Sequence, residues 1–145
     1  MVHRFEVEVT PPNEWGGRQA MIRVDGRPLI DLIRDLESAS AAADGQPDLA
    51  GKYGYLSAAD ALFPSRQLLG EAVRPLLAYD DRVSVLECEC GCEGCWPLLM
   101  QITVTEDSVI WSAPRQHHRD HWLYPPDWQL VFDRRQYERA LGFPV

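Results

Sequence analysis

The stretch from residue 83 to residue 112 reads VSVLECECGCEGCWPLLMQITVTEDSVIWS and decides the fold. It contains three apolar or β-prone runs, at 83–90, 98–105 and 109–112. Runs of this kind, separated by short turn-forming segments, predict strands that pair with their neighbours in antiparallel order. We therefore expect an antiparallel β-meander in which the cysteine-rich segment 91–97 lies at the end of the first hairpin.

The residues before this stretch predict two strands and a helix. Apolar and polar side chains alternate over 5–9, as in a half-buried strand, and 20–24 is expected to form a second strand. From residue 29 to residue 36, apolar side chains recur at positions i, i+3, i+4 and i+7, which places them on one face of a helix that begins after Pro28. The alanine-, glycine- and serine-rich segment 38–54 is expected to be this helix fraying into a long loop.

The residues after this stretch predict one more strand and one more helix. Alternation over 128–132 indicates the strand, and Asp133 with Gln136 three positions later resembles a capping box at the start of the helix. Strands and helices follow one another without a βαβ rhythm, which favours an α+β fold over a doubly wound sheet. We expect an antiparallel sheet with helices packed on one face.

Length and charge limit the classes of protein to consider. A chain of 145 residues with 46% hydrophobic residues fits a single globular domain over 1–145. Acidic side chains number 22 against 14 basic ones, and the formal net charge of −8 disfavours binding to nucleic acid or to a membrane surface. The N-terminal residues lack the apolar run of a secretory signal, so a cytoplasmic location is expected.

The cysteines are the one group in the sequence that points to chemistry. All of them lie within eight positions: Cys88, Cys90, Cys92 and Cys95. Thiolates bind zinc, and the glycines between them let a short loop fold back so that several sulfurs converge. Four sulfurs this close would crowd one tetrahedron, so a histidine is an easier fourth ligand. The candidates are His117, His118 and His121.

Two other interpretations of the cysteines stay open. Neighbouring thiols, including the pair in Cys92-x-x-Cys95, can form a disulfide reversibly, as in a thiol redox sensor. Reduced cysteines can also simply fill space beside a sheet. Three nearby carboxylates should raise the thiol pKa values unless a cation neutralises the group, and this favours a bound cation over free-thiol catalysis. They belong to Glu87, Glu89 and Glu93.

The sequence contains none of the familiar catalytic motifs, such as a phosphate-binding loop, a nucleophile elbow or a His-Glu-x-x-His pair. It favours a small zinc-binding domain with a structural metal that acts as a binding or interaction module. The acidic charge would suit a basic protein partner. The alternative is a metalloenzyme in which zinc keeps one position for water and one of the three glutamates is the general base.

The second half of the chain contains a series of short motifs: Cys88-x-Cys90-Gly91-x-x-Gly94-Cys95-Trp96-Pro97-Leu98, Val109-x-Trp111, His118-Arg119, Trp122-x-Tyr124 and Phe132-Asp133-x-x-x-Tyr137. In this order they resemble a family of small uncharacterised bacterial proteins with no established activity. The resemblance covers the chain from Val83 onward, and the chain departs from the family pattern at His117, where the family has proline. Cys92 is a variable position within it. The zinc ligands that the resemblance implies are Cys88, Cys90, Cys95 and His118, with Cys92 as an alternative ligand.

Overall fold

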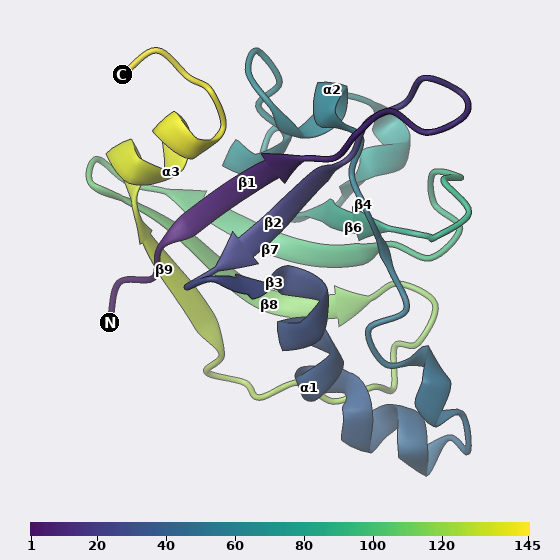
Figure 1. Ribbon diagram of the computed structural model, residues 1–145. Helices are drawn as coiled ribbons and strands as arrows, with labels where there is room; N and C mark the ends of the chain where they lie inside the picture. The colour runs from purple at the N-terminus through teal and green to yellow at the C-terminus, as the bar shows by residue number, and fades with distance from the viewer.

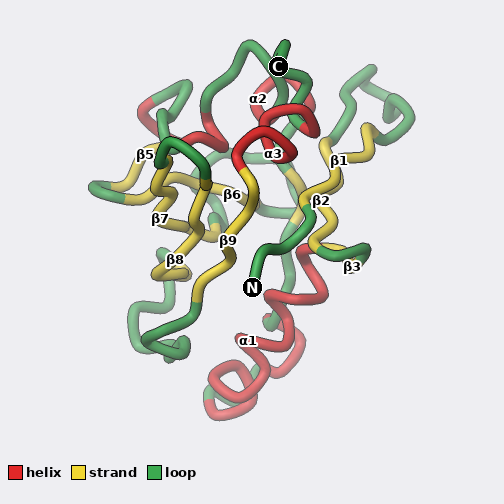
Figure 2. The backbone as a smooth tube through the Cα atoms, turned by 90° about the vertical axis from the view of Figure 1, so that its left-hand side faces the viewer, coloured by secondary structure: helices red, strands yellow, loops and turns green.

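A computed structural model describes residues 1–145 as two antiparallel sheets that pack against each other, with helices at their margins (Figure 1). The smaller sheet has the order β1-β2-β3. Its strands are β1 (Phe5–Val9), β2 (Ala20–Val24) and β3 (Arg27–Pro28). Viewed from the side, this sheet and the larger one form separate layers (Figure 2). The expected α+β class is confirmed.

The larger sheet contains the predicted meander. Its order is β4-β6-β7-β8-β9, and β5 pairs with β6 off this path. The strands are β4 (Gly54–Tyr55), β5 (Ala78–Tyr79), β6 (Arg82–Glu87), β7 (Leu98–Val104), β8 (Ser108–Gln116) and β9 (Gln129–Asp133). Two bounds differ from the prediction by more than one residue: β6 ends before the first cysteine, and β8 continues to Gln116.

The helices are α1 (Leu29–Ala43), α2 (Ala58–Ala61) and α3 (Arg134–Ala140), with 3₁₀ turns at Pro47–Leu49, Gln67–Leu69 and Pro75–Leu77. The prediction that the first helix frays from residue 38 is wrong, because α1 continues to Ala43. Alanine is the best helix former, and the buried stripe of α1 follows i, i+4 spacing through this segment. That stripe consists of Leu29, Ile33, Glu37 and Ala41. None of the helices combines the length and apolarity required to cross a bilayer.

Hydrogen bonds join the two sheets at opposite corners. At one corner the His3 amide donates to the Val131 carbonyl at 2.7 Å, and at the other the Ala20 amide donates to the Leu56 carbonyl at 3.0 Å. The space between the sheets is filled by a core of 22 buried residues. The smaller sheet therefore closes over the larger one and forms a half-barrel.

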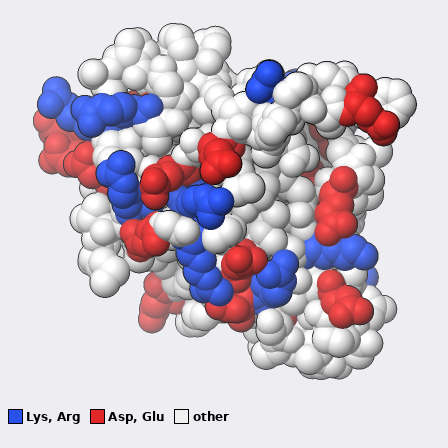
Figure 3. Space-filling model, in the orientation of Figure 1, with Lys and Arg blue, Asp and Glu red and all other residues white.

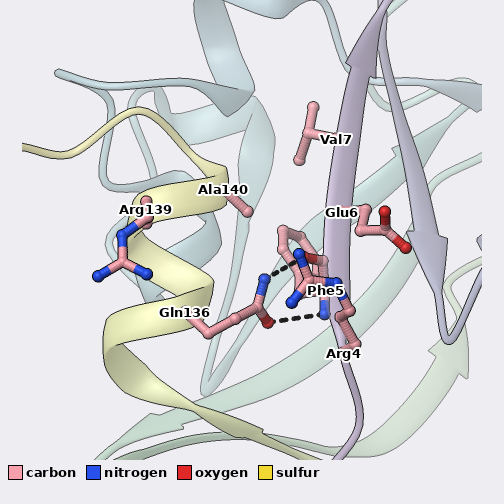
Figure 4. A pocket seen from close by; sticks show the side chains of 7 residues that line it. All are labelled: Arg4, Phe5, Glu6, Val7, Gln136, Arg139 and Ala140. Atoms are coloured by element: carbon pink, nitrogen blue, oxygen red, sulfur yellow. Dashed lines mark hydrogen bonds between the residues drawn. The ribbon is translucent and has the colours of Figure 1, made fainter.

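The Gln136 side chain joins helix α3 to strand β1 through hydrogen bonds (Figure 4). The Phe5 amide donates to Gln136 Oε1 at 2.9 Å, and Gln136 Nε2 donates to the Phe5 carbonyl at 2.6 Å. The Asp133 side chain caps α3 by accepting from the Gln136 amide at 3.0 Å. The cap is thus confirmed, while the Gln136 side chain binds β1 and does not reach back to complete the capping box.

Tyr137 of α3 makes the polar contacts at the centre of the core. Its hydroxyl donates to the Leu68 carbonyl and accepts from Trp111 Nε1 at 3.0 Å, and the side chain is fully buried. Removing this hydroxyl would leave a donor and an acceptor without partners in a region that water does not reach.

We predict that Tyr137→Phe lowers the free energy of unfolding by about 2–4 kcal/mol, because both orphaned groups stay buried. Urea denaturation followed by tryptophan fluorescence measures the change. Tyr55→Phe is the matched control: the Tyr55 hydroxyl accepts only one long bond, 3.4 Å from the Ile30 amide, and its loss should cost less than about 1 kcal/mol. Equal losses in the two variants would contradict the central role of Tyr137.

Candidate metal centre

The loop between β6 and β7 brings three of the four cysteines together. One sulfur from each of Cys88, Cys90 and Cys95 lies within 4.8 Å of the other two. All four cysteines are free, so no disulfide holds them in place. Zinc–sulfur bonds of about 2.3 Å in a tetrahedron separate the sulfurs by about 3.8 Å, so a modest contraction of this group would complete a three-thiolate site. These three residues could hold a metal ion.

Turn geometry, and not strand alternation, creates this convergence. The sequence predicts a strand over 83–90, but β6 ends at Glu87, so Cys88 and Cys90 lie in the loop and not in the strand. The Gly91 amide donates to the Cys88 carbonyl at 3.0 Å, and Gly91 itself has a φ of +82°, which L side chains rarely adopt. The Cys90 amide points at the Cys88 sulfur, 3.5 Å away. An amide donor at that position stabilises a thiolate.

Strand β4 approaches the base of the loop closely because residue 54 is a glycine. Gly54 pairs with Glu87, and a Cβ atom there would lie 3.2 Å from the Cys88 carbonyl oxygen. This approach brings the segment before β4 beside the cysteines, where a cavity of about 320 Å³ opens. The cavity is lined by the three grouped cysteines and by Leu49, Lys52, Glu89 and Trp96. Sequence reasoning missed Lys52, although it is the only lysine in the chain.

Hydrogen bonds within the cysteine group shift the pKa values of Cys90 and Cys95 in opposite directions. Hydrogen bonding, first from Cys88 and then from Cys92 and Cys95, lowers the pKa of Cys90 to about 7. The Cys95 thiol donates to the same group, and its hydrogen bonds with Cys88 and Cys90 raise its pKa to about 12. Cys90 therefore loses its proton easily, whereas Cys95 retains its proton because a second thiolate would add negative charge beside the first. A bound divalent cation removes that penalty and favours full deprotonation.

The three candidate histidines have different partners, although the rings of His117 and His118 lie 4.9 Å apart. His118 Nε2 lies 3.0 Å from the Gly94 carbonyl oxygen, and its ring stacks on Trp96 with centroids 6.1 Å apart. The His117 ring lies 4.7 Å from that of Tyr79. His121 Nε2 is 2.8 Å from the carboxylate of Asp44 at the end of α1. His118 therefore contacts the cysteine loop, but its ring nitrogens are not part of the sulfur group.

The three glutamates diverge and do not surround the sulfurs. Glu87 is buried, with Oε1 3.0 Å from Ser84 Oγ and Oε2 without a hydrogen-bond partner, and burial raises its pKa to about 7. Glu93 pairs with Arg74, which also binds Asp60. Glu87 and Glu93 line a different cavity, so Glu89 alone borders the cavity that the cysteines share.

A buried carboxylate, that of Glu37, holds the frame around the site. Its Oε1 accepts from the Gly51 amide at 2.9 Å, and its Oε2 accepts from the hydroxyls of Tyr53 and Tyr124 at 2.6 Å each. Gly51 has a φ of +67°, and a Cβ atom there would lie 2.6 Å from the Arg34 Cβ, so only glycine fits. Helix α1 is thereby tied to two loops distant in sequence.

Gln116 extends this network to the cysteine loop. Its Nε2 donates to the Tyr53 hydroxyl at 3.3 Å and to the Pro97 carbonyl at 3.0 Å, and its Oε1 accepts from the His118 amide at 2.7 Å. Pro97 follows the last cysteine by two positions. One buried side chain therefore positions both the C-terminal end of the loop and the backbone of His118.

Comparison with protein-family models, with curated proteins and with solved structures finds no match for this chain. The resemblance to a bacterial family that the motifs suggest therefore stays a prediction. The chemistry of the site follows from its own residues, three free thiols that converge beside a cavity.

We predict that Glu37→Gln lowers the free energy of unfolding by about 1–3 kcal/mol, because an NH₂ group replaces one of the two oxygens that accept from three donors. Burial raises the pKa of Glu37, so the folded protein binds this proton more tightly than the unfolded chain. The stability that this bound proton contributes is complete below the pKa that Glu37 has in the unfolded chain. It is lost as the pH rises through the higher pKa of Glu37 in the folded protein. The stability advantage of the wild type over the variant should thus be largest at acid pH.

Urea denaturation at several pH values measures this difference, and the exposed Glu106 provides the control. Glu106→Gln should change stability by less than about 0.5 kcal/mol at every pH. A Glu37→Gln difference that stays constant across the acid range would contradict the assignment of a raised pKa to Glu37.

Proposed function

We propose that this protein is a zinc-binding module in which Cys88, Cys90 and Cys95 hold the ion. The observation that carries the proposal is the convergence of three free thiols within 4.8 Å of one another at one hairpin end. Thiolate sulfur is the ligand type that structural zinc sites use most. Three thiolates this close repel one another, and a divalent cation bound between them would offset that repulsion.

For the fourth ligand we propose His118, with Cys92 as the alternative. His118 is already held against the loop through the Gly94 carbonyl, and it would exchange that contact for the metal. Cys92 lies in the same loop, where its pKa is raised mainly by its hydrogen bond to Cys90. If His118 is the fourth ligand, His118→Ala should weaken zinc binding; if Cys92 is, Cys92→Ser should do so.

We propose a structural metal and a role in binding a protein partner. The ten residues 88–97 have no strand or helix of their own, so an ion that links three of them would order the loop and contribute to folding. Acidic side chains outnumber basic ones, which suits a basic partner in the cytoplasm and disfavours nucleic acid. On the face shown in Figure 3 the two kinds of charge are interspersed, so recognition would not rest on charge alone.

A thiol redox sensor is the second candidate function. It is favoured by the lowered pKa of Cys90, about 7, because a thiolate at neutral pH is the form that attacks a disulfide. The two functions differ in what the reduced protein carries: zinc in the first, free thiols in the second.

We predict that protein purified under reducing conditions without added zinc carries a single zinc ion per chain. Elemental analysis measures the metal, and calorimetry measures the melting temperature before and after removal of the metal by a chelator. Cys88→Ser, Cys90→Ser and Cys95→Ser should each lose the ion and melt at a lower temperature, because each removes a ligand. Cys92→Ser and His118→Ala identify the fourth ligand, since only the variant that removes it should weaken zinc binding.

A metal-free preparation whose thiols interconvert with a disulfide would support the redox sensor and contradict the zinc module. Retention of stoichiometric zinc by all three single serine variants would contradict the assignment of these cysteines.

A further inference from the structure

The cavity beside the cysteine loop lies where an additional metal ligand would enter. All three grouped cysteines, Cys88, Cys90 and Cys95, line this one cavity of about 320 Å³. Zinc takes four ligands, so an ion held by three thiolates has a fourth position, which His118 fills when no external ligand is bound. Because the three ligand residues border the same space, that position is accessible from the cavity. The volume is at the lower end for small-molecule pockets, which limits the occupant to a small molecule.

One wall of the cavity is apolar and held in place from behind. Trp96 stacks on the ring of His118, with 17° between the ring planes, and the Arg119 guanidinium lies 4.9 Å from the Trp96 ring centroid. Trp96 also packs against the small buried cluster that contains Trp122. With Leu49, it presents a fixed hydrocarbon surface that suits a short aliphatic segment of a ligand.

Lys52 places a single positive charge beside the thiols. The residues on both sides of it are anchored, since the Gly51 amide and the Tyr53 hydroxyl both donate to Glu37. Its own ammonium group forms none of the ion pairs or side-chain hydrogen bonds of the structure, and the side chain is exposed. An unpaired ammonium group at the edge of a pocket is suited to bind a carboxylate.

Glu89 places a negative charge on the same cavity. It is exposed, and it too takes part in none of the ion pairs. A ligand that satisfies both charges carries a carboxylate for Lys52 and an ammonium group for Glu89. A ligand that also completes the coordination of a thiolate-bound zinc ion carries a soft donor, for which sulfur is the natural choice.

We propose that this cavity binds a small zwitterionic aminothiol, whose sulfur replaces His118 as the fourth ligand of the metal and whose carboxylate pairs with Lys52. The inference rests on the proposed zinc site at the three cysteines. On binding, the thiol S–H gives its proton to solvent and the sulfur takes the position of His118, whose Nε2 returns to the Gly94 carbonyl, while the metal keeps its oxidation state. The ammonium group pairs with Glu89, and the connecting carbons lie against Leu49 and Trp96.

Cobalt(II) in place of zinc tests the proposal, because its absorption reports both thiolate ligation and tetrahedral geometry. The reduced protein is loaded with cobalt under anaerobic conditions and titrated with L-cysteine as the probe. We expect saturable growth of the thiolate-to-cobalt charge-transfer band at one equivalent, with the cobalt still eluting with the protein in gel filtration. L-serine, which lacks the sulfur, should leave the spectrum unchanged.

Two truncated probes and two variants assign the charged contacts. Cysteamine lacks the carboxylate and 3-mercaptopropionate lacks the ammonium group, and each should bind about fivefold more weakly than L-cysteine, the loss typical of one partly exposed ion pair. Lys52→Met should weaken L-cysteine to the same extent and leave cysteamine unaffected, whereas Lys52→Arg should restore most of the affinity. Glu89→Gln should weaken the binding of L-cysteine and leave that of 3-mercaptopropionate unaffected.

The outcomes separate this inference from the proposed function. If cobalt gives no thiolate charge-transfer band at all, the metal site itself fails. If the band is present and L-cysteine does not change it, while Cys92→Ser or His118→Ala does, the fourth ligand is internal; the zinc module then stands and the ligand site is overturned. Binding of L-cysteine that Lys52→Met leaves unchanged would likewise overturn the proposal.

Discussion

The hydrogen bonds to the Glu37 carboxylate are the constraint on which the site depends. A buried carboxylate is costly unless donors surround it, and here three donors from two separate loops meet on α1. Their convergence fixes the segment 51–53 beside the β6–β7 loop. Through Tyr53 and Gln116 the same network reaches the backbone of Pro97 and His118. The cysteine loop thus lies on a rigid frame, although it has no regular secondary structure of its own.

The thiols are the reactive groups of the site, and the charged side chains around them determine what can bind beside them. Three sulfurs close together oppose their own full deprotonation, which is the physical reason to expect a cation. The neighbouring carboxylates contribute less than their positions in the sequence indicate, because Glu87 is buried away from the sulfurs and Glu93 pairs with Arg74. Lys52 and Glu89 remain as the charged groups that border the same space as the sulfurs.

Local patterns predicted most of the fold. The alternation in Phe5–Val9 and the apolar runs on either side of the cysteines became strands in the expected antiparallel order. The length of α1 was underestimated because composition alone does not show that Glu37 is buried. Nor does it show that Gly51, Tyr53 and Tyr124 donate hydrogen bonds to its carboxylate. The position of Lys52 could not be predicted, since it follows from a pairing between Gly54 and Glu87, residues far apart in the chain.

The sequence by itself determined the α+β class, the meander and the grouping of the cysteines, because each of these follows from residues close together in the chain. The tertiary structure alone decided which three sulfurs converge, where the histidines and glutamates point, and which side chains share a cavity with the thiols. These features depend on turns with positive φ angles and on contacts between distant segments. Periodicity carries no information about either.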